Sequence, residues 1–420
     1  MSSTQTQSRS TRDLAAVVHQ MIEDVRARGD AAVRELSARF DRWEPESFRL
    51  SEDEIEACIA KVDDQTLEDI RFAQSQVRRF AEAQRASLTD VEVETLPGVF
   101  LGHRHVPISA VGTYVPGGRY PMVASAHMSV VTARAAGVER VASCTPPYQG
   151  APTPATIAAM HLAGADEIYV LGGVQALAAL ALGTETIPRV DLLVGPGNAY
   201  VAEAKRQLFG DVGIDLLAGP TEILVIADEH ADPVIVAADL VGQAEHGPTS
   251  PAVLITTSSE LAERVAAEVD RQLADDLPTA EVAGAAWRDH GAIHVVASPE
   301  EAVALADEHA FEHVEVLTEE PRWYLQRLRN YGALFLGEGT TVAYGDKTIG
   351  TNHILPTAGA ARYSGGLWVG KFLKTITHQE VRSPESAALI GETCARQCRV
   401  EGFEGHARTC DVRVAKLRGS

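Results

Sequence analysis

An α/β fold built on parallel β-sheets is the architecture that this 420-residue sequence predicts. Three features indicate it. The first part of the chain has a helical pattern, short Val-, Ile- and Leu-rich runs then alternate with helical stretches, and the length suffices for two or more domains. Such alternation is typical of βαβ units, in which successive strands lie parallel in one sheet.

The helical pattern extends from Asp13 to about Leu88. Gly29 interrupts it, and Ser51 with Glu54 forms a capping box ahead of a long amphipathic segment. The residues before Asp13 are polar and have no apolar stretch behind their charges, so we expect a frayed or arm-like tail at 1–12 rather than a secretory signal.

Strand-like runs begin after Pro107 and form two series. The first series is 108–115, 139–143, 167–171, 191–194 and 223–227, and the second is 252–256, 292–296, 313–317 and 333–336. Two α/β series in succession predict two sheets with a cleft between them. Past about Trp368 we expect no further strands and a small, mostly helical segment.

The amino-acid composition limits the classes of molecule that the protein is expected to bind and the compartment in which it is expected to occur. A formal charge of −21 opposes binding to nucleic acid or to an anionic membrane, and an anionic substrate would require a local group of donors. Five cysteines without an even spacing favour a reducing cytoplasm. Cys394 and Cys398 lie one helical turn apart, which fits either core packing or a soft metal. The most apolar run, from Val170 to Leu182, is too short to span a bilayer.

Polar clusters in the second half of the chain predict a metal-dependent oxidation site. Gln243 and His246 lie three residues apart on a predicted helix and share a face, as zinc or manganese ligands or as a hydrogen-bonded pair. Asp346 lies in a loop that we expect between glycines 345 and 350, where a carboxylate serves as a ligand or caps a turn. Glu312 and His313 stand at the start of a predicted strand and can share one site only if the strand begins there.

Three glycine-containing turns follow predicted strands. Gly195-Pro-Gly-Asn198 opens a helix, so it is either a phosphate site or a tight strand-to-helix connection. The same two interpretations apply to Tyr114-Val-Pro-Gly-Gly118 and to Gly172-Gly-Val-Gln175.

Over nearly its whole length the chain resembles the histidinol dehydrogenase family. The matching stretches are Gly112-Thr-Tyr-Val-Pro-Gly-Gly118, Gly195-Pro-Gly-Asn-Ala-Tyr-Val201, Ala218-Gly-Pro-Thr-Glu-Ile-Leu-Val-Ile-Ala-Asp228, Gln243-Ala-Glu-His-Gly247, and Gly345-Asp346 through Thr351-Asn-His-Ile-Leu-Pro-Thr357. The resemblance implies an NAD-dependent homodimer with one zinc ion per subunit. It also implies two incomplete Rossmann-like domains with a cleft between them, and small helical terminal segments.

The division of the chain that this resemblance implies has four parts. A first, discontinuous α/β domain is expected at 13–113 and 224–368, and the Rossmann-like NAD-binding domain at 114–223. The tail is expected at 1–12, and a C-terminal segment at 369–420 is expected to complete the site of the partner subunit.

The resemblance also assigns residues to roles. The zinc-ligand positions are Gln243, His246, Asp346 and His406, and the acid/base pair is Glu312 and His313. Positions that touch NAD are Tyr114, Gln175 and Asn198, and positions that touch substrate are Thr221, His353 and Glu401.

Departures from the histidinol pattern are similar to relatives that oxidise 2,3-dihydroxypropane-1-sulfonate (sulfopropanediol). Thr221 stands where a serine is expected, Phe311 replaces a proline, and Lys347 replaces a tyrosine. Arg119, His127 and Lys347 would add donors for a sulfonate, although Arg119 and Lys347 also fit as solvated surface charges.

The expected reaction is oxidation of a primary alcohol through a bound aldehyde to a carboxylate, with sulfopropanediol as the small anionic substrate. The alternatives are the oxidation of L-histidinol to L-histidine, another small polyol or hydroxy acid, and a catalytically silent binding or regulatory protein.

Overall fold

The computed structural model describes residues 2–117, 121–217, 219–275 and 277–419, and for residues 2–12 the backbone alone. The chain divides into two compact units: unit 1 comprises residues 1–84 and 108–372, and unit 2 comprises residues 85–107 and 373–420. Within the described residues, every helix is too short or too polar to cross a lipid bilayer.

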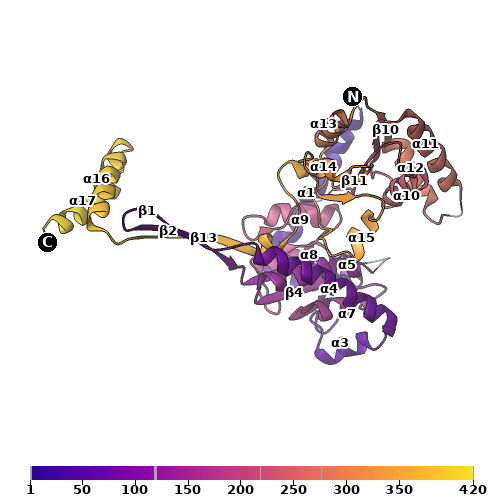
Figure 1. Ribbon diagram of the computed structural model, residues 1–420. Helices are drawn as coiled ribbons and strands as arrows, with labels where there is room; N and C mark the ends of the chain where they lie inside the picture. The colour runs from indigo at the N-terminus through magenta and orange to yellow at the C-terminus, as the bar shows by residue number, and fades with distance from the viewer. Residues whose placement is uncertain (1, 118–120, 218, 276, 420) are drawn as a thin grey trace. The chain divides into compact units, whose positions relative to one another are not determined.

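Two five-stranded parallel sheets lie in unit 1 (Figure 1). The first has the order β5-β4-β3-β6-β7 and the second the order β10-β9-β8-β11-β12. The strands of the first sheet are β3 (Ala110–Tyr114), β4 (Arg140–Thr145), β5 (Glu167–Val170), β6 (Leu192–Val194) and β7 (Gly213–Ile214), and those of the second are β8 (Ile223–Ala227), β9 (Ala252–Thr256), β10 (Gly291–Val295), β11 (His313–Leu317) and β12 (Ala333–Leu336). The predicted α/β class with parallel sheets is therefore confirmed.

Helices cover both faces of the first sheet, as buried strands of mixed Val, Ile and Leu require. Four helices pack against one face around Leu177 and Tyr169, and helices from the chain between Glu52 and Ala163 pack around Ile168 on the other. The first group is α1 (Ser2–Arg28), α2 (Asp30–Asp41), α8 (Gly173–Leu182) and α9 (Ala199–Leu208), and the second includes α3 (Glu52–Ile59), α4 (Asp64–Ala86), α5 (Val123–Ala126) and α7 (Pro154–Ala163).

The second sheet is covered in the same way. Its helices are α10 (Pro233–Ala244), α11 (Ser259–Ala274) and α12 (Ala280–His290) on one face and α13 (Pro299–His309) with α14 (Pro321–Leu325) on the other. Unit 1 also contains the π-helix η1 (His127–Val131), α6 (Thr132–Ala136), α15 (Val342–Lys347), and the short 3₁₀ helices η2 (Ala360–Arg362) and η3 (Val369–Phe372).

Unit 2 contains an antiparallel sheet that the sequence analysis missed. Its order is β1-β2-β13, from β1 (Val91–Leu96), β2 (Val99–Pro107) and β13 (Leu373–Val381). The helices α16 (Pro384–Val400) and α17 (Glu404–Arg418) follow and lie side by side (Figure 1). The expectation of no strand after Trp368 was wrong, because β13 pairs with a strand more than 260 residues earlier and has no alternating apolar pattern, being exposed along most of its length.

Two further boundaries differ from those expected from the sequence. The helix α1 includes residues 2–12, where a tail was expected. The helices α1 and α2 pack on the sheet that contains β3, whereas the sequence analysis grouped residues 13–113 with the second series of strands. The capping box formed by Ser51 and Glu54 is present as predicted at the start of α3.

Candidate active site

Glu312 and His313 lie together at the start of β11. This strand begins at His313, which pairs with Ile223 of β8. Glu312 Oε2 lies 3.6 Å from His313 Nδ1, and both side chains are buried. The sequence analysis required that the strand begin at this point if the two residues are to share one site, and it does. Because Glu312 precedes the strand, its side chain can turn to the side on which His313 lies.

The hydrogen bonds of His313 define which ring nitrogen is free. Nδ1 lies 3.1 Å from the main-chain oxygen of Glu222 and 3.4 Å from Gln243 Nε2. We assign the hydrogen to Nδ1 because the carbonyl is the nearer partner and can only accept, whereas the Gln243 amide has a closer acceptor in Thr221 Oγ1. Nε2 is buried and has no hydrogen-bond partner among the described residues, and it lies 3.9 Å from Asp346 Oδ1. Burial lowers the pKa of His313 to about 4. At neutral pH this ring is therefore an uncharged base with an open Nε2 lone pair.

Burial favours the uncharged form of Glu312 as well, although here the uncharged form is the protonated one. Its Oε2 accepts hydrogen bonds from Thr221 Oγ1 at 2.5 Å and from the Glu222 amide at 3.3 Å. Burial raises the pKa of Glu312 to about 8 despite these bonds. Gln243 Nε2 donates in turn to Thr221 Oγ1 at 2.6 Å, so one chain of hydrogen bonds links Gln243, Thr221 and Glu312.

Glu222 supports this pair and was not singled out in the sequence. Its buried side chain accepts from the amides of Glu312 (3.3 Å) and Ala358 (3.1 Å) through Oε1, and burial raises the pKa of Glu222 to about 7. It thus joins the starts of β8 and β11 to the chain after His353. No local pattern could have identified it, since its partners are 90 and 136 residues away.

Three of the four predicted metal ligands line one cavity. Gln243, His246 and Asp346 surround a space of about 280 Å³ together with Lys347 and Asp239. His246 Nδ1 lies 3.2 Å from the Gln243 main-chain oxygen and so carries a hydrogen, which leaves Nε2 free to bind a metal. Gln243 uses its amide nitrogen on Thr221 and retains its amide oxygen. One imidazole nitrogen, one amide oxygen and one carboxylate are donors that zinc accepts.

Asp346 lies in a helix rather than in the expected loop. The helix α15 includes it, and the loop prediction was wrong because bonds from distant residues cap this short helix. Glu315 accepts from the Val342 amide and Asp239 from the Thr341 hydroxyl, each at 2.9 Å.

Two other predicted site histidines, His353 and His127, each have their own hydrogen-bond partners. His353 Nδ1 lies 2.9 Å from the Asp346 main-chain oxygen and Nε2 lies 3.4 Å from Ser125 Oγ. His127 is buried, Gln74 Nε2 lies 3.2 Å from its Nδ1, and burial lowers the pKa of His127 to about 4. Burial also lowers the pKa of His353. At neutral pH, His127 can offer a substrate an N–H group but no positive charge.

The remaining predicted substrate and metal residues are distributed as follows. Lys347 is exposed, with Nζ 3.9 Å from Asp346 Oδ2, and Arg119 lies outside the described residues. Glu401 caps the end of α16 and His406 lies on α17, and both are exposed in unit 2. The centroid of the His406 ring lies 5.5 Å from that of Phe403, with the two rings tilted by 52°.

The three predicted cofactor residues line a second cavity of about 550 Å³. Tyr114 ends β3, Gln175 lies in the first turn of α8, and Asn198 precedes α9. Asn198 Oδ1 also accepts from the amides of Tyr200 and Val201, so it caps α9 whatever else it binds. Asp41, which the sequence analysis did not identify, lines the same cavity and accepts from Gln175 Nε2 at 3.0 Å.

A buried ion pair fixes the turn beside this cavity. Lys205 and Asp215 pair below the surface, with Lys205 donating to the Gly195 oxygen (3.0 Å) and Asp215 accepting from the Gly195 amide (2.7 Å). Gly195 has φ 122°, and a Cβ there would lie 2.1 Å from the Tyr114 oxygen, so only glycine fits.

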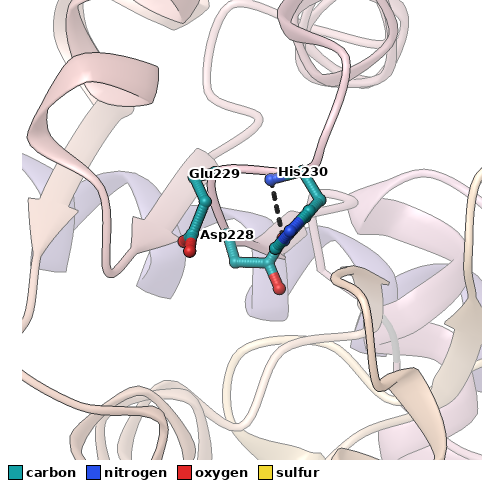
Figure 2. A group of neighbouring side chains, drawn as sticks. All are labelled: Asp228, Glu229 and His230. Carbon is teal, nitrogen blue, oxygen red and sulfur yellow. Dashed lines mark hydrogen bonds and ion pairs between the residues drawn. The ribbon is translucent and has the colours of Figure 1, made fainter.

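One further group has a metal-like arrangement. Asp228, Glu229 and His230 gather after β8 (Figure 2). Asp228 already accepts from the amides of His230 (3.0 Å) and Glu319 (2.9 Å), which makes it a loop-forming residue. Glu229 and His230 are exposed, so this group offers no enclosed site.

The chain is similar to known proteins along most of its length. The family model described as histidinol dehydrogenase matches residues 4–414. A protein named histidinol dehydrogenase homolog, from Shouchella clausii, is 62% identical, covering 95% of this chain and 94% of that protein. Sulfopropanediol 3-dehydrogenase from Ruegeria pomeroyi is 50% identical, covering 96% and 93%. The crystal structure of histidinol dehydrogenase from Elizabethkingia anophelis matches with a TM-score of 0.91 and 35% identity, covering 96% and 93%.

Proposed function

The chain belongs to the histidinol dehydrogenase family, a family of dehydrogenases that act on small molecules, and we propose that it oxidises sulfopropanediol to sulfolactate with zinc and NAD. The observation that carries the choice of substrate is the 50% identity, over 96% of this chain, to a sulfopropanediol 3-dehydrogenase. Thr221, Phe311 and Lys347, which depart from the histidinol pattern, agree with it.

Gln243, His246 and Asp346 would hold the zinc ion, and His406 would be the fourth ligand. When bound, zinc would stabilise the deprotonated alcohol oxygen and NAD would accept a hydride in each of the two oxidations. Tyr114, Gln175 and Asn198 would bind NAD. The cavity beside them includes the first turns of α8 and α9, whose amide groups suit a pyrophosphate.

His313 would take the proton of the alcohol through Nε2. This nitrogen is unprotonated, buried and unpartnered among the described residues, and the low pKa of His313 keeps it in the basic form. Its Nδ1–H bond to the Glu222 oxygen fixes the ring, so the base is oriented before substrate arrives.

Glu312 would act in the second half of the reaction. The aldehyde must be hydrated before it can lose a second hydride, and a carboxylate with a pKa of about 8 can accept a proton from the attacking water. Thr221 and the Glu222 amide would hold the ionised form in place. His353 and Glu401 would contact the substrate.

The sulfonate would be bound by N–H donors and by positive charge. Lys347 lies at the cavity that contains the proposed zinc ligands and would supply the charge, while His127 would supply an N–H group and Arg119 a second charge. A histidinol imidazole has no need of such an anion site.

A homodimer is proposed for this enzyme because unit 2 cannot bury its own apolar side chains. Val400 is 90% exposed, Val412 63% and Leu389 59%, and a second copy would cover such side chains. Residues 369–420, with Glu401 and His406, would then complete the site of the partner subunit. All five cysteines are free, which supports a cytoplasmic location.

The test compares two substrates with one preparation. Purified, zinc-loaded protein is given NAD⁺ with sulfopropanediol or with L-histidinol, and NADH formation is followed to completion. The proposal expects two NADH per sulfopropanediol and a far lower kcat/KM with histidinol. Preference for histidinol would support the alternative that the similarity to the Elizabethkingia enzyme favours, and no NADH with either would indicate a silent binding protein or a different polyol substrate.

A further inference from the structure

A half-buried and a fully buried carboxyl group lie near each other at the cavity of Gln243, His246 and Asp346. Asp239 lies on α10 and lines that cavity, and Glu315 lies on β11 and is fully buried. Each has one oxygen with an ordinary donor: Thr341 Oγ1 for Asp239 Oδ1 and the Val342 amide for Glu315 Oε1.

The other two oxygens require a hydrogen between them. Asp239 Oδ2 and Glu315 Oε2 are both buried, and neither finds an N–H or O–H donor among the described residues. The two carboxyl groups lie within hydrogen-bonding reach of each other. Two ionised carboxylates have only acceptors, so a bond between them exists only when one of the two carries a proton. Burial, followed by the charge of Asp239, raises the pKa of Glu315 to about 9, which keeps that proton in place at neutral pH.

The pair joins the three elements that carry the site residues. Asp239 lies one helical turn before Gln243 on α10, so the two share a face. Glu315 lies two residues after His313 on β11, on the same side of the strand. Thr341 and Val342 begin α15, the helix that carries Asp346.

We propose that Asp239 and Glu315 are a positioning pair whose shared hydrogen fixes α10, β11 and α15 relative to one another and so sets the spacing of the metal-binding side chains. The inference rests on the proposed function for the metal. It predicts that the bridging hydrogen matters rather than either carboxylate charge.

Amide substitutions test this requirement directly. In Asp239→Asn or Glu315→Gln, the new amide donates the bridging hydrogen and its oxygen keeps the outer partner. In the double variant Asp239→Leu with Glu315→Met, neither side chain can donate a hydrogen bond, and the bridge is lost. Asp232→Asn, an exposed cap of the same helix α10, is the matched control, since asparagine also caps.

Zinc affinity against a graded chelator series is the first measurement. We expect each single variant and Asp232→Asn to stay within a few-fold of the parent, and the double variant to lose about 10- to 100-fold, as residues that orient metal ligands do. Two outcomes would overturn the inference. In one, the free energy of zinc binding lost in the double variant equals the sum of the losses in the two single variants. In the other, each single variant loses as much zinc affinity as the double variant.

Amide hydrogen exchange at 342–347, measured in chelator, separates this inference from the proposed metal site. Exchange should accelerate in the double variant alone, because the cap of α15 loosens with or without metal. An unchanged exchange rate at 342–347 in the double variant would refute the proposed role of Asp239 and Glu315. Zinc retained in His246→Ala would instead refute the assignment of the metal ligands. The exchange measurement, which is made without metal, would still test the role of Asp239 and Glu315.

Discussion

Replacement of Thr221 by valine should move the pH dependence of turnover. The Thr221 hydroxyl donates to Glu312 Oε2 at 2.5 Å and accepts from Gln243 Nε2 at 2.6 Å. Valine has nearly the same shape and removes both bonds. The Glu312 carboxylate then loses the only hydroxyl donor that it has among the described residues, while the protonated form loses less.

The size of the effect follows from the bond that is lost. A hydrogen bond to a charged group contributes about 1.5–3 kcal/mol, and one pKa unit corresponds to about 1.4 kcal/mol. The pKa of Glu312 is raised to about 8 by burial, and Thr221 holds it below what burial alone would give. Thr221→Val should therefore raise it by about one unit or more. Because Glu312 is proposed to act as a base, turnover should appear only at correspondingly higher pH.

The assay is kcat against pH for the zinc-loaded enzyme with saturating NAD⁺ and the aldehyde as substrate, which isolates the second oxidation. Thr221→Ser keeps the hydroxyl and is the matched control, with an expected midpoint close to that of the parent. The shift of the midpoint is the test, since bound metal and substrate change its absolute position. Equal midpoints for the parent, Thr221→Ser and Thr221→Val, or a downward shift in Thr221→Val, would refute the reasoning.

Four further predictions use the same preparation. His313→Gln should lower kcat by about 10²- to 10⁴-fold, as removal of a general base does, with zinc retained by elemental analysis; a loss of zinc would contradict its role as base. His246→Ala and Asp346→Ala should each lose zinc, and full occupancy in both would contradict the ligand assignment. Cys144→Ala should leave turnover unchanged, because burial raises the pKa of the Cys144 thiol and keeps it unreactive; lost turnover with bound metal would oppose this. Lys347→Ala should raise KM for sulfopropanediol about 10-fold while Lys347→Arg restores it, and an unchanged KM would identify Lys347 as a solvated surface charge.

The sequence predicts those parts of the site that depend on local chemistry. The run of Glu312 and His313 at a strand start, and Gln243 three residues before His246, are patterns in neighbouring residues, and the structure places them beside one another. The parallel sheets were predictable for the same reason, because each strand is a short continuous apolar run.

The sequence does not predict the parts that depend on distant partners. Glu315 occurs within an apolar strand segment and Glu222 directly before one, and neither stands out until its partners are known. The helix α15 forms around Asp346 because Glu315 and Asp239, 27 and 102 residues from their partners, cap its start. Likewise β13 exists only through pairing with β2. Such contacts override local propensity and leave no periodic signal.

The two sheets use opposite ends for the two proposed tasks. Tyr114, Gln175 and Asn198 follow the carboxyl ends of β3, β5 and β6, where ligands of parallel sheets usually bind, and helix N-termini there favour a phosphate.

The proposed acid/base pair, Glu312 and His313, instead lies at the amino ends of the second sheet, since β11 begins at His313 and the Glu312 partner Thr221 precedes β8. Gln243 and His246 lie at the carboxyl end of α10, where the helix dipole favours a cation. A search for ligand sites at the carboxyl ends of the parallel strands alone would find the cavity of the proposed NAD residues and would miss Glu312 and His313. The carboxyl end of α10 and the amino ends of α8 and α9 thus match the charges of the groups proposed for the two cavities, and this agreement does not depend on which alcohol is the substrate.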